Sequence, residues 1–336
     1  MQGVELIYAY LAVLRILESP HYLRYSTEMS NDPFSDILKF ANAETVVSGG
    51  FTAGGRWAIR FPEMEKVKFS AIVRGDCWLS IKGEELSVHA ETGDVLLLST
   101  QHSFVLTNDL QSNPVDAASL FTHNASTIAK LGEGDEFFQI GGFVRLDSVS
   151  GGLLADVLPP LIHVTASSTQ ATVLHWLVNQ LVHEQAAERP GSTLVSAQLA
   201  QLIFVQLVRA HLETSSGELT SGLLRALSDP LIAPALRLMH NNPGHLWHLN
   251  ELAQAAAMSR TTFALRFKQA AGVTPLTYLT EWRMRLAERA LREENAPISI
   301  IASRLGYTSI SAFSNAFKRV TGNAPKRYRS IVRTTQ

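Results

Sequence analysis

The hydrophobic pattern along the chain changes its period near residue 160. Between residues 44 and 143, short runs of β-branched and aromatic residues alternate with glycine, asparagine and aspartate turns, a pattern typical of strands. It places turns at pairs such as Gly93-Asp94 and Gly141-Gly142, and it predicts strands over residues 56–61, 67–73, 76–81, 86–91, 94–99, 103–108 and 136–140. Evenly spaced short strands of this kind indicate an antiparallel β-sandwich or a small β-barrel.

Beyond Pro159-Pro160 the apolar residues recur with the period of a helix. Residues 172–188 and 193–214 predict two helices, divided by a turn at Arg189-Pro190-Gly191. The second helix is apolar around much of its circumference, and the first carries at helical spacing Val173, Trp176, Leu177, Gln180, Leu181 and Glu184. Helices this apolar are buried, either within their own domain or against a second subunit. We expect part of this surface to form a homodimer contact.

The charge of the chain is strongly uneven, although its total is only −1. Residues 230–336 hold 15 of the 29 Lys and Arg residues but only 5 of the 30 acidic residues, a net charge of +10 that leaves −11 on the rest. A basic module joined to an acidic remainder suggests binding to a polyanion. We expect the linker between the two parts at Ser215-Ser216-Gly217.

Cysteine use and N-terminal hydropathy limit the class of protein. Cys77 is the single cysteine, which excludes a disulfide framework and a multi-cysteine zinc site and fits a reducing compartment. The apolar stretch at residues 4–17 contains Glu5 and Arg15 and is shorter than the ~20 residues of a bilayer crossing. We therefore expect a cytoplasmic protein without a membrane partner.

Within the basic third, one sequence pattern occurs twice. The first copy runs over residues 252–272 and the second over residues 301–322, and from Ser259 and Ser309 onward their offset is a constant 50 residues. Each copy predicts a short helix, a tight turn and a second helix with serine at its N-cap. Gly306 suits the turn of the second copy, whereas Ala257 is less comfortable in the first. The pattern is that of two helix-turn-helix units, and the alternative is an all-α domain whose basic residues are merely solvated.

The second helix of each unit has an apolar side and an opposite outward side. Phe263 and Phe267 in the first unit correspond to Phe313 and Phe317 in the second, and we expect all four to face the core. The outward side is the one that a recognition helix turns toward base edges in the major groove. The candidates for base-edge contact are Thr261, Ala264, Leu265, Ile310, Ser311, Ser314 and Asn315.

A long helix between the units sets their spacing. We expect it over residues 275–294, and twenty residues at ~1.5 Å each span ~30 Å, close to the ~34 Å between successive major-groove faces. Phosphate contacts supply affinity without sequence information. The principal candidates for these are Ser259, Arg260, Lys268, Arg283, Ser309, Lys318, Arg319, Lys326 and Arg327, with Arg285, Arg289, Arg292, Arg304 and Arg329 as further basic residues.

Motifs in both parts of the chain match known proteins. In the basic part these are Met258-Ser259-Arg260, Gly272-Val273-Thr274-Pro275, Trp282-Arg283-Met284, Ala316-Phe317-Lys318-Arg319 and Pro325-Lys326-Arg327-Tyr328-Arg329. Through them residues 229–330 resemble the DNA-binding domain of AraC/XylS-type bacterial transcription regulators. Residues 31–227 resemble the cupin-type sensor domain of one branch of that family, through Asp32-Pro33-Phe34-Ser35-Asp36, Arg60-Phe61-Pro62, Arg74-Gly75-Asp76-Cys77-Trp78-Leu79 and Leu158-Pro159-Pro160.

The resemblance implies a multidomain β plus α fold. We expect an N-terminal extension at residues 1–28, a cupin-like antiparallel β-barrel at 29–150, a helical dimerisation and linker region at 151–228, and an all-α DNA-binding domain at 229–336. The implied partners are double-stranded promoter DNA, an unidentified small-molecule effector, a second copy of the chain and RNA polymerase. No residue is assigned to the effector and no cofactor is expected. Where relatives often carry a basic residue on each recognition helix, this chain has Leu265 and Asn315, so its operator is expected to differ.

An enzyme is the alternative class, as a cupin oxygenase or isomerase tethered to DNA. Catalytic cupins usually bind a metal through histidines and a carboxylate on neighbouring strands, but Val67-Lys68-Phe69-Ser70 and Phe104 stand at the corresponding places here. We expect no metal site and no catalytic residue, and we expect the histidines to be hydrogen-bonded structural residues. These are His89, His102, His175, His183, His245 and His248.

Cys77 leaves two interpretations open. A thiol in a strand beside Trp78 is by default buried and inert, and the alternative is a redox sensor whose oxidation shifts DNA binding. A methyl-transfer DNA-repair protein that shares this DNA-binding fold would need a cluster of activated cysteines, which one cysteine does not supply.

Overall fold

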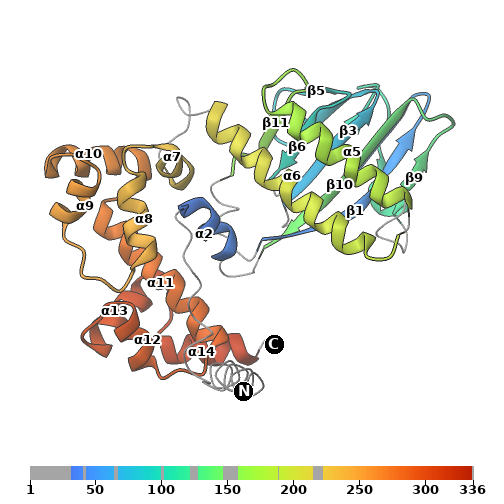
Figure 1. The fold of residues 1–336 in the computed structure, drawn as a ribbon. Coiled ribbons are helices and arrows are strands. Elements are labelled where there is room, and N and C mark those ends of the chain that lie inside the picture. Colours follow the sequence, from blue (N-terminus) through green and yellow to red (C-terminus); the bar gives the residue numbers. More distant parts are fainter. Residues whose placement is uncertain are drawn as a thin grey trace, which may run out of the picture.

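The computed structural model describes residues 32–40, 43–63, 67–99, 102–121, 128–146, 158–187, 189–214 and 222–334. The N-terminal extension and the linker predicted at residues 215–217 lie outside the described residues. The chain forms a β-rich N-terminal part and an all-helical C-terminal part, as the sequence predicts (Figure 1).

Two facing sheets form the N-terminal domain. The six-stranded sheet has the order β11 (Leu161–Val164), β6 (Val95–Leu98), β3 (Val67–Arg74), β10 (Phe137–Arg145), β1 (Glu44–Ala53) and β9 (Ile128–Leu131). The five-stranded sheet has the order β5 (Val88–Glu91), β4 (Asp76–Ile81), β7 (Phe104–Thr107), β2 (Ala58–Phe61) and β8 (Val115–Asp116), with helix α3 (Ala117–Leu120) after it. Among the described residues no hydrogen-bonded strand pair joins the two sheets, so the predicted cupin-like barrel is open.

All seven predicted strands are present, within a few residues of their expected bounds except for the longer β10. The turn predicted at Gly141-Gly142 is wrong, because both glycines lie inside β10. A Cβ on Gly142 would lie 2.3 Å from the Val46 carbonyl oxygen, and one on Gly141 would lie 2.6 Å from that of Phe69. Glycine is therefore used here for close approach to the strands on both sides rather than for a turn.

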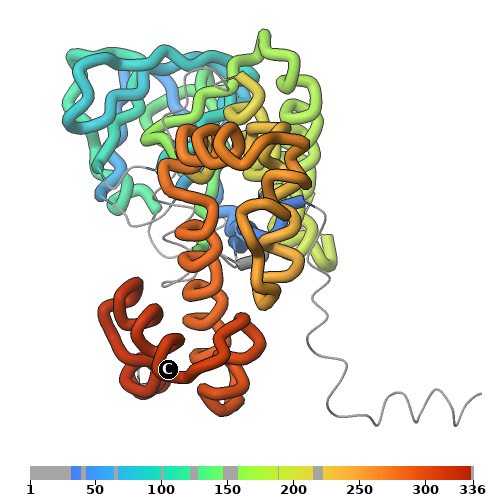
Figure 2. Tube along the Cα trace, turned by 90° about the vertical axis from the view of Figure 1, so that its left-hand side faces the viewer, coloured from blue at the N-terminus to red at the C-terminus, as the bar shows by residue number. Residues whose placement is uncertain are grey.

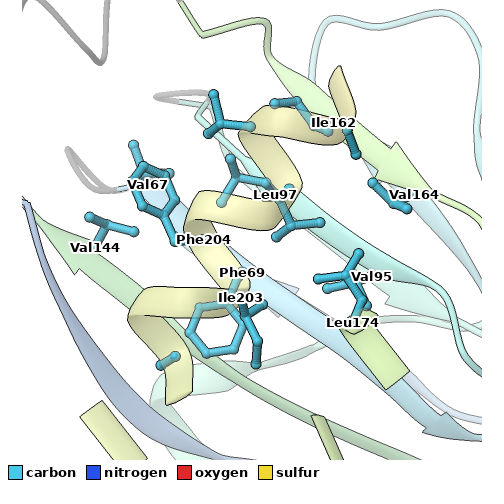
Figure 3. Close-up of a cluster of buried hydrophobic side chains, with 14 of the residues drawn as sticks. Val67, Phe69, Val95, Leu97, Val144, Ile162, Val164, Leu174, Ile203 and Phe204 are labelled. Carbon is cyan, nitrogen blue, oxygen red and sulfur yellow. The ribbon is translucent and has the colours of Figure 1, made fainter. Parts of the chain in front are cut away.

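Helices α5 (Ala171–Ala187) and α6 (Ser192–Thr214) cover the outer face of the six-stranded sheet (Figure 1), as expected for apolar helices. Phe69 and Leu97 of the sheet meet Phe204 of α6 in this layer (Figure 3). By length and composition α6 alone among the described helices is apolar enough to span a membrane, and one of its faces, with Ile203, Phe204 and Leu207, belongs to the core of the domain. The predicted burial of α5 holds for Leu177 and Leu181.

The inner core lies between the two sheets. It is rich in aromatic side chains, and Trp57 packs edge-on against Phe51 and lies 4.5 Å from Phe137 between ring centroids. Because side chains alternate along a strand, the residues of β3 divide between the layers: Phe69 faces the helices, and Ile72 faces the inner core.

The C-terminal part consists of α7 (Leu223–Ser228), α8 (Ala233–Asn241), α9 (Leu249–Ala255), α10 (Arg260–Ala271), α11 (Pro275–Glu293), α12 (Ile298–Arg304), α13 (Ile310–Thr321) and α14 (Pro325–Thr334). One hydrophobic cluster holds α8, α9 and α10 against the start of α11, and a second holds α12, α13 and α14 against its end. Two small units therefore share α11 as a common rod (Figure 2).

One further helix was not predicted. Helix α2 (Pro33–Phe40) precedes β1 in the chain but lies against α8 of the C-terminal part (Figure 1). Asp32 caps it, accepting hydrogen bonds from the Phe34 amide at 3.0 Å and the Ser35 hydroxyl at 2.6 Å. An aspartate at this position satisfies amide groups that a helix leaves free at its N-terminus.

Candidate nucleic-acid interface

The two helix-turn-helix units have the same caps. Ser259 accepts a hydrogen bond from the Thr262 amide at 3.2 Å, and Ser309 accepts one from the Ala312 amide at 3.3 Å. Both second helices end at a glycine in the left-handed conformation, Gly272 after α10 and Gly322 after α13. The internal repeat predicted from sequence is thus a repeat of structure.

The turns of the two units differ in one residue. Gly306 has a φ of 79°, and Ala257, at the equivalent position, has a φ of 51°. The turns are otherwise alike, because the Met258 amide donates to the Ala253 carbonyl at 2.9 Å and the Tyr307 amide donates to the Ala302 carbonyl at 3.0 Å. Ala257 is the one non-glycine residue with a positive φ in the described part of the chain, and a Cβ in that region is strained.

The apolar sides of α10 and α13 are fully buried. Phe263, Phe267, Phe313 and Phe317 each have 0% of their surface exposed, as predicted. The opposite sides are open: exposed side chains there are Thr261, Leu265, Lys268, Ser311, Asn315 and Lys318. Ile310 is exposed as well, whereas Ala264 and Ser314 are half-buried.

The two recognition helices lie on the same side of the molecule. Figure 2 views α10 and α13 on the face turned away from the β-sheets, with the rod α11 between them. The 19 residues of α11 at ~1.5 Å each give a rod of ~28 Å, comparable with one turn of duplex DNA at ~34 Å. The exposed faces of the two helices are therefore separated by about the distance between two adjacent major-groove contacts.

Most of the principal phosphate candidates are on the surface. The exposed ones are Ser259, Arg260, Lys268, Ser309, Lys318, Arg319, Lys326 and Arg327. Several of the further basic residues have protein partners. Arg289 pairs with Glu293 at 3.0 Å and Arg304 pairs with Glu294 at 2.7 Å, while Arg285 pairs with Glu288 and Arg329 donates to the Ala296 carbonyl.

Arg283 is not a surface residue, which corrects its assignment to phosphate. It is 8% exposed, and its guanidinium donates to the carbonyl oxygens of Pro243 at 2.6 Å and His245 at 2.8 Å. The same group lies 5.8 Å from the centre of the Tyr307 ring. Arg283 therefore joins the α8–α9 loop of the first unit to the turn of the second. Its place in the sequence, among other basic residues of the rod, does not reveal this role.

The histidines of the sensor domain have short-range partners. His163 pairs with Asp94 at 2.7 Å, His89 pairs with Asp76 at 2.9 Å, and His175 lies 2.8 Å from the Gly93 carbonyl oxygen. In the described ranges no group of three or more His, Cys, Asp or Glu side chains converges as metal ligands would. Of the histidines expected to be structural, His89 and His175 therefore have hydrogen-bond partners within the domain.

Cys77 faces the inner core and is fully buried. Burial, reinforced by the negative charges of Asp76 and Asp94, raises the pKa of its thiol to about 12. Because the thiolate is the reactive form, this environment favours the inert-thiol interpretation over a redox sensor.

Two places in the sensor domain have polar groups without an assigned role. A cleft of about 170 Å³ lies between β3, the β5–β6 turn and α5, and Thr92, His175 and Asn179 contribute to its wall. Inside the domain, Ser70 Oγ and Gln139 Oε1 are buried, and neither finds a hydrogen-bond partner among the residues that the structure describes. Both residues alternate with side chains of the helix layer, so they face the space between the sheets.

Comparison with known proteins gives matches to both parts of the chain. A cupin family matches residues 32–213, and a helix-turn-helix domain family matches residues 252–331. The chain is 41% identical to an AraC-like transcription regulator of Streptomyces antibioticus, over 89% of this chain and 98% of that one. It is 34% identical to the RCS-specific HTH-type transcriptional activator RclR of Escherichia coli (strain K12), over 90% of this chain and 98% of that one.

Among solved structures, the DNA-binding domain of AdpA, described as a global transcriptional factor and crystallised in complex with a target DNA, is 30% identical. The match covers 32% of this chain and 96% of that domain, with a TM-score of 0.31.

Proposed function

Because the chain belongs to the AraC-type DNA-binding transcription regulators with an N-terminal cupin domain, we propose that α10 and α13 read two successive turns of promoter DNA under the control of a small molecule bound by the cupin domain. The observation that carries the DNA part is the pair of matched open faces on a basic domain. At the centre of each face lies the side chain that we propose contacts a base, Leu265 on α10 and Asn315 on α13. A lysine lies beside each, Lys268 on α10 and Lys318 on α13.

The two readers differ in the base that they recognise. The exposed Leu265 side chain supplies an apolar contact for a thymine methyl group, and the Asn315 amide can donate to and accept from an adenine edge. Lys268 and Lys318 contact phosphates, which carry no base identity. The two half-sites are therefore expected to differ in base preference.

Selection from a random-sequence duplex library with the full-length protein tests the proposal. Wild type is expected to enrich a site with two blocks about one helical turn apart and to lose affinity steeply as salt rises. Asn315→Ala relaxes preference in one block, and Lys268→Ala weakens all sites with a salt slope reduced by about 1. Lys130→Ala, a lysine lost from the exposed face of β9, is the matched control. Failure of the wild type to bind any duplex at low salt refutes the proposal.

Effector binding inside the cupin domain is supported by Ser70 and Gln139. A buried polar atom without a partner costs free energy, commonly about 1–3 kcal/mol, and a polar ligand between the sheets would supply the missing hydrogen bonds. A thermal-shift screen of small polar metabolites should identify a compound that stabilises the wild type. Gln139→Leu should abolish that shift while DNA affinity without the compound is unchanged, and a compound that stabilises both proteins equally contradicts this placement.

Dimerisation through the helical layer is supported by apolar side chains left on its surface. Val173 and Trp176 of α5 are 48% and 59% exposed, and Val195 and Leu202 of α6 are 43% and 49% exposed. Clustered exposed apolar side chains mark interaction surfaces. Trp176→Glu should convert a dimer to a monomer in sedimentation velocity, whereas Leu86→Glu in a distant exposed turn should not. A wild type that is monomeric at micromolar concentration excludes the dimer.

The regulator we propose acts in the cytoplasm and contacts RNA polymerase at its promoter. Its relatives are named transcription regulators, so its role is regulatory rather than catalytic.

A further inference from the structure

The middle of the rod α11 packs in the hydrophobic cluster of the N-terminal domain, whereas its two ends pack in the clusters of the helix-turn-helix units. Tyr278 and Leu279 belong to the cluster of the first unit, and Met284 and Ala287 belong to the cluster of the second. Trp282, between them, packs instead in the cluster of the N-terminal domain. It is only 4% exposed, and the His240 ring of α8 covers one of its faces.

Helix α2 is part of this cluster and lies at the junction of the two parts of the chain. Phe34 and Ile37 of α2 belong to the same cluster as Trp282, and α2 lies directly against α8. Ile37 is 1% exposed, although the helix that carries it stands apart from the sheets at the junction of the two parts of the chain (Figure 1).

A polar contact accompanies the apolar one. Asp36 of α2 places its carboxylate 3.7 Å from Nδ1 of His240 on α8, and both residues are buried. The other ring nitrogen of His240 lies 2.7 Å from the Tyr278 hydroxyl, and its ring stacks on Trp282 at 4.1 Å between centroids. Asp36 therefore reaches the rod through one intermediate, the His240 ring, which contacts α11 at two successive turns.

The other end of α2 leads into strand β1, which pairs with the strand that carries Gln139. Only three residues separate α2 from β1, and Phe51 of β1 is paired with Gln139 of β10 in the six-stranded sheet. A displacement of β1 is therefore transmitted to α2 through only a short length of chain. Because the recognition helices lie on the far side of the rod, α2 does not block access of DNA to them (Figure 2).

We propose that α2 is the element through which the sensor domain positions the DNA-binding domain, by packing against α8 and placing Asp36 beside His240. In this role α2, through its contact with α8, holds the first unit and the rod α11 in one position relative to each other. That position favours contact with two successive turns of DNA. The inference rests on the proposed function for its consequence in DNA binding, while the docking of α2 is measurable without DNA.

Hydrogen–deuterium exchange of the full-length protein tests the docking. Ile37→Ala should raise exchange about fivefold or more in α8 and in the middle of α11, the order of a modest coupling free energy, and should leave β3 and β10 protected. Ile128→Ala, at an exposed isoleucine of β9, is the matched control and should change neither. Unchanged exchange in α8 and α11 overturns the proposal. If Ile37→Ala also raises exchange in β3, Asp36→Asn is compared with the wild type instead, because that substitution leaves the side-chain volume unchanged.

Affinity for a duplex selected by the wild type tests the consequence. Asp36→Asn and Ile37→Ala should each weaken binding about fivefold or more. Loss of an acidic charge alone would strengthen DNA binding, and Asp76→Asn at the exposed start of β4 measures that effect. Affinities of both α2 variants within twofold of wild type overturn the positioning role. If the wild type binds no duplex, the proposed function fails, and the exchange result still decides whether α2 docks.

Discussion

Ala257→Gly is expected to stabilise the DNA-binding domain, because the residue adopts a conformation that suits glycine. Its φ of 51° brings the Cβ close to the following carbonyl, at a cost of about 1–2 kcal/mol. Glycine removes that cost but gives the unfolded chain more freedom, which offsets about 0.4–1 kcal/mol. The net gain is about 0.5–1 kcal/mol, and for a domain of this size it raises the midpoint of unfolding by about 2–5 °C.

The equivalent position of the second unit supplies the reciprocal change. A Cβ on Gly306 would lie 2.3 Å from the Gly244 carbonyl oxygen and 3.0 Å from the Arg283 guanidinium, in addition to the strain of its φ of 79°. Gly306→Ala should therefore cost about 3 kcal/mol or more, as overpacking adds to backbone strain.

Differential scanning calorimetry of the full-length protein measures both variants on the transition of the C-terminal domain. The reasoning requires opposite signs, with Ala257→Gly raising the midpoint and Gly306→Ala lowering it. A lower or unchanged midpoint for Ala257→Gly would show that the turn of the first unit is not strained by its alanine.

Three further outcomes follow from the buried groups. Arg283→Ala should destabilise the protein by about 2–4 kcal/mol, since two charge-assisted hydrogen bonds are lost. The slope of log affinity for DNA against log salt concentration should stay the same as in the wild type. A slope lower by about 1 would show that Arg283 contacts a phosphate. Burial lowers the pKa of His240, and Asp36 opposes this shift. The unfolded state therefore binds more protons than the folded state as the pH falls below about 6.5, and the free energy of unfolding should decrease from about pH 7.5 to about pH 5.5. Equal decreases in wild type and His240→Gln, measured by urea unfolding, would contradict this. The Cys77 thiol, whose pKa burial raises to about 12, should react with maleimide in the native protein far more slowly than after unfolding; rapid native labelling would reopen redox sensing.

Local patterns decided most of the elements. The spacing of Phe263 and Phe267, repeated at Phe313 and Phe317, is enough to orient both recognition helices, because a helix repeats every 3.6 residues whatever it packs against. The serine caps and the left-handed glycines are likewise properties of a few neighbouring residues. The same holds for the bounds of α5 and α6, which fall within a residue of their predicted bounds.

Contacts between distant segments were outside the reach of such patterns. Arg283 reads as one more surface base in a basic stretch, and only the loop folded over it makes it a buried donor. Gly141-Gly142 has the composition of a turn, and only the strands on either side show that it is a place of close approach. Trp176 and Leu177 belong to the same predicted apolar face of α5, but the domain core covers Leu177 and leaves Trp176 exposed.

The sequence by itself determined the two-part architecture, the repeated helix-turn-helix units and the polarity of their faces, because hydrogen bonding and side-chain period within a helix or strand depend on residues close in the chain. The tertiary structure alone decided that α2, from the sensor domain, packs against α8 and brings Asp36 to His240. Residues separated by some two hundred positions leave no periodic trace of each other, and their contact exists only once both domains have folded and packed together.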